Sequence, residues 1–220
     1  MSNNNKYIEN NAHINKTYAI VWMHGLGADP SDFAQLGPML NIEDSFYIVC
    51  PFAPIKPVTI NMGMRMRSWH DINSLHNPEE NNYEGIYESE KFIINIIEEL
   101  KNKGFEYRNI FLGGFSQGGC MALWIATRFA HCLAGSICIS GYIPRIFLEQ
   151  ENTLNDHKSL PIFYGHGKAD ETVLPEHAQA SADWLQAMGY DLKFNWYEMG
   201  HEINQELITD LSFWISKLTR

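Results

Sequence analysis

Cysteine is scarce in this sequence of 220 residues, and the few present follow no pattern of known chemistry. The four cysteines, Cys50, Cys120, Cys132 and Cys138, form no C-x-x-C pair and no spacing typical of a zinc site. Three of them lie in apolar segments, where a free thiol behaves as a small buried hydrophobic group. We therefore expect reduced thiols and an intracellular, cytoplasmic protein.

Long apolar runs and excess positive charge are also missing. No run approaches the ~20 apolar residues that a membrane-spanning helix needs, and the polar start of the chain lacks the apolar region of a signal peptide. We expect the Asn-rich residues 1–17 to form a disordered tail. The formal net charge of −10 argues against nucleic acid as a partner, because nucleic-acid-binding proteins present a basic face.

Motifs for metals and nucleotides are absent as well. The chain contains no G-x-x-x-x-G-K-[ST] and no G-x-G-x-x-G, and the segment that begins at His201 reads HEIN rather than H-E-x-x-H. The sequence therefore implies neither a metal nor a cofactor.

Short apolar segments alternate with longer helical patterns along residues 18–220. The apolar segments are bounded by Gly, Pro or polar residues, which predicts buried strands. The predicted strands are Tyr18–Met23, Phe46–Cys50, Asn109–Gly114, Leu133–Ser140, Pro161–Gly165 and Leu192–Tyr197. The predicted helices are Glu88–Gly104, Gly118–Ala130, Pro175–Gly189 and Asn204–Leu218. This alternation predicts a single α/β domain with a mostly parallel central sheet and helices on both faces.

Residues 51–83 interrupt the alternation with a long segment that contains four prolines. Loops of this length in compact domains are usually functional or disordered. The segment carries Met62, Met64, Met66 and Trp69, and such a cluster suits a flexible apolar wall that covers a substrate. The alternative is that these side chains simply cap the core, and the sequence leaves both interpretations open.

The stretch FLGGFSQGG contains the pattern G-x-S-x-G at Gly114–Gly118. A buried strand is predicted before it and a helix after it, which is the context of a nucleophile elbow. Such a turn holds the serine in a strained backbone conformation, with its hydroxyl exposed at the positive end of a helix. A plain glycine-rich turn is the alternative, but we interpret Ser116 as a nucleophile because partners for it follow.

A serine hydroxyl needs a base, and the base needs an orienting acid. With this kind of elbow, the chain order is Ser, then Asp or Glu, then His. Of the nine histidines, only His177 and His201 come late enough, and His177 lies inside a predicted helix. We choose His201, which follows the last predicted strand, and Asp170 from the loop after the fifth.

A tetrahedral intermediate also needs hydrogen-bond donors for its oxyanion. We expect one donor to be the backbone N–H of Gln117, which directly follows the nucleophile. For the second we choose the N–H of Leu26 in the segment His24-Gly25-Leu26-Gly27, which follows the first predicted strand. We interpret His24 itself as a structural hydrogen-bonding residue.

These segments, taken together, resemble the acyl-protein thioesterase, carboxylesterase and lysophospholipase family. The resemblance rests on HGLGAD, MRSWHDI, GGFSQGG, SGYIP, HGKADETVLP and a late GH, which occur in family order. It implies an α/β-hydrolase fold and cofactor-free hydrolysis of ester or thioester bonds.

The resemblance also implies the substrate class and the site. The substrate would be a small acyl ester, a lipid or an acylated protein. The triad would be Ser116, Asp170 and His201, with Leu26 and Gln117 at the oxyanion. The loop around Trp69 would form the acyl groove, and a homodimer is plausible. His70 departs from the Phe or Tyr that the family pattern has at this position.

Two rival functions remain at this stage. The first is a non-catalytic protein that uses the fold to bind a ligand or partner. The second is a lipase that acts at a membrane surface and inserts its methionine-rich loop, beside Arg65 and Arg67, into lipid.

Overall fold

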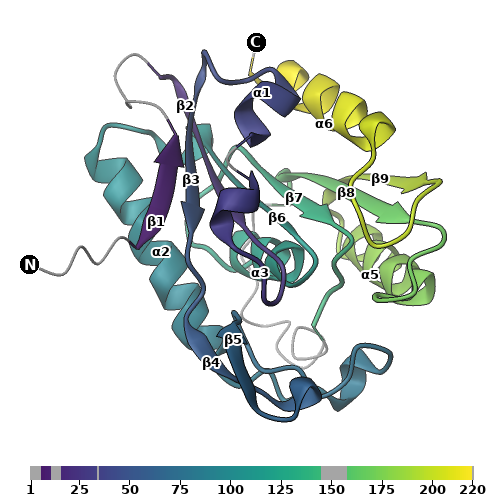
Figure 1. Ribbon diagram of the computed structural model, residues 1–220. Helices are drawn as coiled ribbons and strands as arrows, with labels where there is room; N and C mark the ends of the chain where they lie inside the picture. Colours follow the sequence, from purple (N-terminus) through teal and green to yellow (C-terminus); the bar gives the residue numbers. More distant parts are fainter. Residues whose placement is uncertain (1–5, 11–15, 34, 145–157, 220) are drawn as a thin grey trace, which may run out of the picture.

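A computed structural model describes residues 6–10, 16–33, 35–144 and 158–219 of the chain. Its centre is a sheet of seven strands within these residues, in the order β1-β3-β2-β6-β7-β8-β9 (Figure 1). The strands are β1 (Tyr7–Asn10), β2 (Tyr18–Met23), β3 (Phe46–Pro51), β6 (Ile110–Phe115), β7 (Gly135–Ile139), β8 (Pro161–Gly167) and β9 (Asp191–Tyr197). All neighbouring strands pair in parallel except β1 and β3. The mostly parallel sheet is confirmed, with each of the six predicted strands in place.

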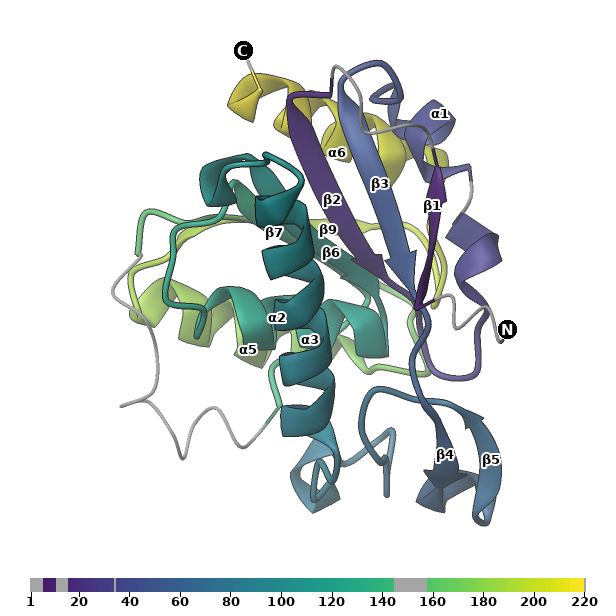
Figure 2. The same ribbon diagram turned by 90° about the vertical axis from the view of Figure 1, so that its left-hand side faces the viewer.

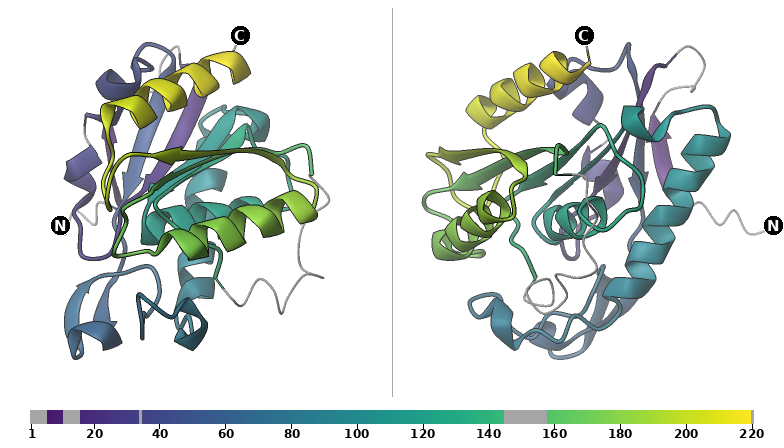
Figure 3. Two further views of the ribbon diagram at one scale, coloured as in Figure 1. Left: turned by 90° about the vertical axis from the view of Figure 1, so that its right-hand side faces the viewer. Right: turned by 180° about the vertical axis from the view of Figure 1, so that it is seen from behind.

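Helices cover both faces of this sheet (Figure 3). One face packs against α2 (Ile86–Asn102), α3 (Gln117–Ala126) and α5 (Pro175–Ala187), and the other against α1 (Leu36–Leu40) and α6 (Gln205–Leu218). Strand β2 shows why two cores form, because Ala19, Val21 and Met23 belong to the first and Ile20 and Trp22 to the second. Neighbouring side chains of a strand point to opposite faces, so a strand buried on both faces is apolar throughout.

The beginning of the chain differs from the prediction. Residues 7–10 form β1, which runs antiparallel to β3 with Tyr7 opposite Pro51 (Figure 2). A disordered tail is therefore wrong for these residues. An uncovered β3 would expose its backbone N–H and C=O groups at the sheet edge, and β1 pairs with them. The tyrosine hydroxyl of Tyr47 also donates to the carboxylate of Glu9.

The long segment after β3 has structure of its own. It contains a hairpin of β4 (Ile55–Val58) and β5 (Met64–Arg67), joined through a short 3-10 helix (Thr59–Asn61). Figure 2 shows this hairpin beyond the carboxyl end of β3, away from the central sheet. Of three further 3-10 helices, Pro30–Phe33 follows β2, Pro78–Glu80 precedes α2, and Tyr107–Asn109 precedes β6.

No helix in the described ranges is long and apolar enough to cross a membrane. The described cysteines are free, and three of the four are buried. The cytoplasmic location stays a prediction.

The crossing of β6 and α3 positions the site, and it depends on glycine. A Cβ atom on Gly114 would lie 2.3 Å from the carbonyl carbon of Gly118, and one on Gly118 would lie 2.0 Å from the carbonyl oxygen of Met23. Real Cβ atoms do not approach backbone so closely, so only glycine allows strand and helix to meet here.

We expect Gly118→Ala to lower the free energy of unfolding by about 2–4 kcal/mol, because the new methyl group must push α3 away from β2. The measurement is urea denaturation. Gly200→Ala is the control, since a Cβ there would meet only the carbonyl oxygen of Ala169 at 3.6 Å. Equal stability of the two variants would contradict the close crossing.

Candidate active site

Ser116 lies at the turn between β6 and α3, with backbone angles of φ 55° and ψ −121°. A non-glycine residue at positive φ is strained, and such strain is found at functional sites when the surroundings enforce it. Two backbone hydrogen bonds hold Ser116 in this conformation. The N–H of Ser116 donates to the carbonyl of Ile139 at 2.8 Å, and its carbonyl accepts from the N–H of Cys120 at 3.1 Å. The serine hydroxyl is thereby held at the N-terminal end of α3.

His201 contacts Ser116 from the other side. Its Nε2 atom lies 2.9 Å from the hydroxyl oxygen of Ser116, and its Nδ1 atom lies 2.8 Å from Oδ2 of Asp170. The ring of Phe115 lies 4.8 Å from the imidazole ring between centroids. These distances are within hydrogen-bond reach at both ring nitrogens, so the structure brings together the three side chains that the sequence predicts.

The loops after β8 and β9 carry Asp170 and His201 and are bonded to each other. The N–H of Lys168 donates to the carbonyl of Tyr197 at 2.9 Å, and the N–H of Ala169 donates to the carbonyl of Met199 at 3.1 Å. Both loops leave the carboxyl edge of the sheet, where ligands collect in open α/β sheets. This link fixes the distance between the acid and the imidazole.

Asp170 is 2% exposed and remains well bonded. Its Oδ1 atom accepts from the N–H groups of Thr172 and Val173, each at 2.9 Å. Burial pushes the pKa of Asp170 up, but the hydrogen bonds from His201 and these N–H groups outweigh it, so the pKa lies below its usual value. The carboxylate therefore stays ionised and can hold the imidazole.

A second histidine, His166, lies beside the same carboxylate. Its Nε2 atom lies 2.9 Å from the carbonyl oxygen of Val173 and 3.5 Å from Oδ2 of Asp170, and the side chain is fully buried. Burial lowers its pKa, which keeps the ring neutral. Our reading of the sequence missed this residue, although it stands four positions before Asp170 in the same motif.

The loop that carries Leu26 lies against the nucleophile. A Cβ atom on Gly25 would lie 3.4 Å from the Cβ of Ser116. In the described part of the chain, neither the N–H of Leu26 nor that of Gln117 donates a hydrogen bond. His24 is buried, its Nε2 accepts from the N–H of Ala53 at 3.2 Å, and its Nδ1 lies 2.7 Å from the carbonyl oxygen of Gly25. The structural role predicted for His24 is confirmed.

The predicted substrate-binding residues separate into two groups. Trp69 is completely buried, and its indole N–H donates to the carbonyl of His24 at 2.8 Å. Trp69 therefore caps the core, the alternative to a groove role. Met62 is 97% exposed, and its groove role stays a prediction. Met66 is half-buried, with its sulfur 3.5 Å from the Cβ position of Gly27, and Met64 is 62% exposed, so for both a groove role stays a prediction.

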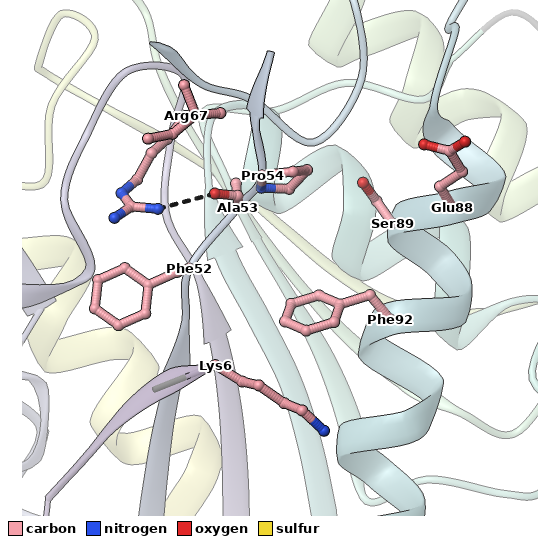
Figure 4. A pocket seen from close by; sticks show the side chains of 9 residues that line it. Lys6, Phe52, Ala53, Pro54, Arg67, Glu88, Ser89 and Phe92 are labelled. Atoms are coloured by element: carbon pink, nitrogen blue, oxygen red, sulfur yellow. Dashed lines mark hydrogen bonds between the residues drawn. The ribbon is translucent and has the colours of Figure 1, made fainter. Parts of the chain in front are cut away.

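A pocket of about 440 Å³ lies between the hairpin and α2 (Figure 4). Its lining is Lys6, Phe52, Ala53, Pro54, Ile55, Arg67, Glu88, Ser89 and Phe92. Ser116, Asp170 and His201 do not line this pocket. Among the described residues, no group of three or more His, Cys, Asp or Glu could hold a metal ion.

Comparison with known proteins identifies the family to which this chain belongs. The profile of the family described as Phospholipase/Carboxylesterase matches residues 3–219. The acyl-protein thioesterase 1 homolog 1 of Dictyostelium discoideum is 31% identical over 96% of this chain and 97% of its own length. Acyl-protein thioesterase 1 of Yarrowia lipolytica is 32% identical over 91% and 92%.

Solved structures place the fold in the same class. SOBER1 of Arabidopsis thaliana superimposes with a TM-score of 0.83 at 28% identity, over 92% of this chain and 99% of that one. Acyl-protein thioesterase 2 of Zea mays gives 0.79 at 25% identity, over 97% and 99%. The fold is that of an α/β-hydrolase, and the protein is a serine hydrolase of this type. It belongs to the phospholipase/carboxylesterase family, whose members hydrolyse ester or thioester bonds.

His70, where the resemblance leads us to expect Phe or Tyr, is completely buried. Its Nδ1 lies 3.0 Å from the carbonyl oxygen of Asp71, while its Nε2 has no partner among the described residues. Burial lowers the pKa of His70 to about 4, with nearby Lys56 acting in the same direction and Asp71 opposing it. The native ring is therefore neutral.

Because its native pKa is low, we expect His70 to lower the free energy of unfolding in acid. Between pH 6.5 and 4 the unfolded chain binds a proton at residue 70 that the native state excludes, so stability falls as the pH falls, by about 3 kcal/mol in all. His70→Phe removes the part of the pH dependence that His70 causes. The contributions of the other titratable groups to the pH dependence of stability remain. We expect urea unfolding from pH 7.5 to 4 to show a steeper decline for the unaltered protein. Parallel curves would contradict the assignment.

Proposed function

We propose that the chain cleaves acyl ester or thioester bonds, with Ser116 as nucleophile, His201 as general base and Asp170 as its orienting acid. The observation that carries this proposal is the pair of contacts made by His201, at 2.9 Å to Ser116 and 2.8 Å to Asp170. Because one imidazole bridges a strained serine and a buried carboxylate, a proton can leave the hydroxyl as it attacks.

Acylation begins when the hydroxyl oxygen of Ser116 attacks the acyl carbonyl carbon and its proton passes to Nε2 of His201. The N–H groups of Leu26 and Gln117 then stabilise the oxyanion of the tetrahedral intermediate. The imidazolium returns the proton to the leaving alcohol or thiol, and the acyl group remains on Ser116. Asp170 accepts the Nδ1 proton in a hydrogen bond, which holds the tautomer and stabilises the charged ring.

Deacylation repeats these steps with water as the nucleophile. His201 takes a proton from the water, the hydroxide attacks the acyl carbon, and the imidazolium returns the proton to the oxygen of Ser116. The fatty acid or other carboxylate is released. The curated relatives are named acyl-protein thioesterases, which supports lipid and acylated-protein substrates for this chain too. A homodimer stays a prediction.

Ser116→Ala tests the nucleophile. We expect kcat for a p-nitrophenyl ester to fall by roughly 10³-fold or more with the fold intact, because the acyl-enzyme can no longer form. A fluorophosphonate probe should label the unaltered protein at Ser116 and leave the variant unlabelled.

Ser136→Ala is the matched control, because Ser136 is a fully buried serine in the neighbouring strand β7. It should keep both activity and labelling. Absence of both labelling and ester turnover in the unaltered protein would support a non-catalytic binding protein. Ester turnover that Ser116→Ala preserves would instead support another nucleophile.

We further propose that the β4–β5 hairpin contacts a membrane surface during catalysis. Three apolar side chains on it are exposed, Ile55 at 53%, Met62 at 97% and Met64 at 62%. Exposed apolar residues gathered on one projection favour an interaction site, and Arg65 on the same hairpin suits lipid headgroups.

Co-sedimentation with phosphatidylcholine vesicles, with and without anionic lipid, tests this contact. We expect Met64→Asp to reduce the bound fraction several-fold, because a carboxylate cannot enter the acyl region. Met39→Asp is the control, since Met39 is 50% exposed on α1 at a distance from the hairpin. Equal binding of all three proteins, or none by the unaltered one, would contradict the hairpin contact.

A further inference from the structure

The side chain of Gln117 makes contacts that its backbone role does not require. It is 3% exposed although it belongs to the first turn of α3. Its Oε1 atom accepts from the N–H of Trp69 at 2.9 Å, and its Nε2 atom donates to the carbonyl of His70 at 2.8 Å. Nε2 also lies 3.1 Å from the hydroxyl of Ser68. The amide therefore binds residues 68–70, and residues 67–70 are named here the bridging segment.

The bridging segment also binds the loop that carries Leu26. The carbonyl of Arg67 accepts from the N–H of Gly27 at 2.9 Å, one residue after Leu26. The indole N–H of Trp69 donates to the carbonyl of His24 at 2.8 Å, two residues before Leu26. The rings of Trp69 and His24 lie 5.3 Å apart. Both sides of Leu26 are thus bonded to the segment that Gln117 holds.

Hydrogen bonds also hold the segment on the side of the pocket. The pocket of about 440 Å³ opens beside Arg67 and Ser89 (Figure 4). Beside the pocket, the guanidinium of Arg67 donates to the carbonyl of Ala53 at 3.0 Å, and the hydroxyl of Ser89 donates to the carbonyl of Trp69. The N–H, the carbonyl and the indole N–H of Trp69 are therefore all hydrogen-bonded. Together these bonds constrain both the backbone and the ring orientation of Trp69.

We propose that the bridging segment, held by the side chain of Gln117 and the indole of Trp69, sets the spacing of the two oxyanion donors. This inference rests on the proposed function, in which the N–H groups of Leu26 and Gln117 stabilise the oxyanion. Gln117 then acts twice, through its backbone N–H as a donor and through its side chain as a positioning residue for the donor of Leu26. Trp69 is a positioning residue as well.

The chemistry makes this spacing matter. Each donor must lie about 3 Å from the oxyanion rather than from the ground-state carbonyl, and a displacement near 1 Å can cost about 100-fold in rate. A buried amide that loses its hydrogen-bond partners destabilises the structure, so the Gln117 side chain keeps the bridging segment in place. A donor that is only misplaced should impair kcat while substrate binding persists.

Gln117→Met tests the proposal, because methionine matches glutamine in length, keeps the backbone N–H and removes both side-chain bonds. We expect kcat to fall roughly 10- to 100-fold with KM changed by less than about threefold. The active fraction is first measured by complete labelling with a fluorophosphonate, so that kcat refers to competent sites. A variant that was only less well folded would show fewer sites with normal kcat.

A transition-state analogue provides the second readout. An aryl trifluoromethyl ketone adds the hydroxyl oxygen of Ser116 to its carbonyl carbon, the proton passes to His201, and the former carbonyl oxygen becomes an oxyanion. We expect its inhibition constant to rise in Gln117→Met by the same factor as kcat/KM falls. A structural role alone would leave this constant unchanged.

Trp69→Phe and Trp22→Phe form a matched pair that does not depend on Gln117. Both tryptophans are at most 1% exposed, but in the described residues the indole N–H of Trp22 has no partner. We expect both variants to lose stability, Trp69→Phe more because the carbonyl of His24 loses its donor. A roughly 10-fold fall in kcat for each titrated site and weaker analogue binding are expected only for Trp69→Phe. If Gln117→Met does not fold, the comparison of Trp69→Phe with Trp22→Phe still tests the positioning role of the bridging segment.

Two different outcomes distinguish failure of the positioning role from failure of the proposed function. Normal kcat for each titrated site and unchanged analogue affinity in Gln117→Met and Trp69→Phe would overturn the positioning role, with the proposed function intact. Failure of the unaltered protein to react at Ser116 would overturn the proposed function itself.

Discussion

The strained backbone of Ser116 is the constraint on which the rest of the site depends. A positive φ at a serine costs on the order of 1–3 kcal/mol, so it persists only because neighbouring structure permits no other path. Two glycines, Gly114 and Gly118, let β6 and α3 cross at contact distance. The bond from the N–H of Ser116 to Ile139 ties the turn to the adjacent strand β7. The sheet therefore holds the hydroxyl where loops from other strands can reach it.

The loops that carry Asp170 and His201 to the serine are hydrogen-bonded to each other. Backbone hydrogen bonds join the loops after β8 and β9, which carry Asp170 and His201. On the opposite side, the bridging segment joins the Leu26 loop to Gln117. Hydrogen-bonded loops thus flank the turn at Ser116 on two sides, and these bonds help to hold the distances near 3 Å.

The sequence predicted the elements and residues that have local signals, and it missed those defined by distant contacts. Ser116 was found because a strand, two glycines and a helix surround it, and His201 because chain order excludes its competitors. Strand β1 was missed, since only its pairing with β3 makes polar residues 7–10 a strand. Trp69 was misassigned because apolarity alone suggests a groove, whereas its indole N–H binds a carbonyl supplied by a distant loop. The side-chain role of Gln117 has no local signature either.

The covalent intermediate is the central claim of this account, and peptide mass mapping tests it most directly. The unaltered protein would be mixed with a slowly hydrolysed acyl thioester and quenched in acid during turnover. The account predicts an added acyl mass on the peptide that contains Ser116, which disappears when the substrate is exhausted. Acyl mass on a different residue, or turnover with none on Ser116, would contradict it.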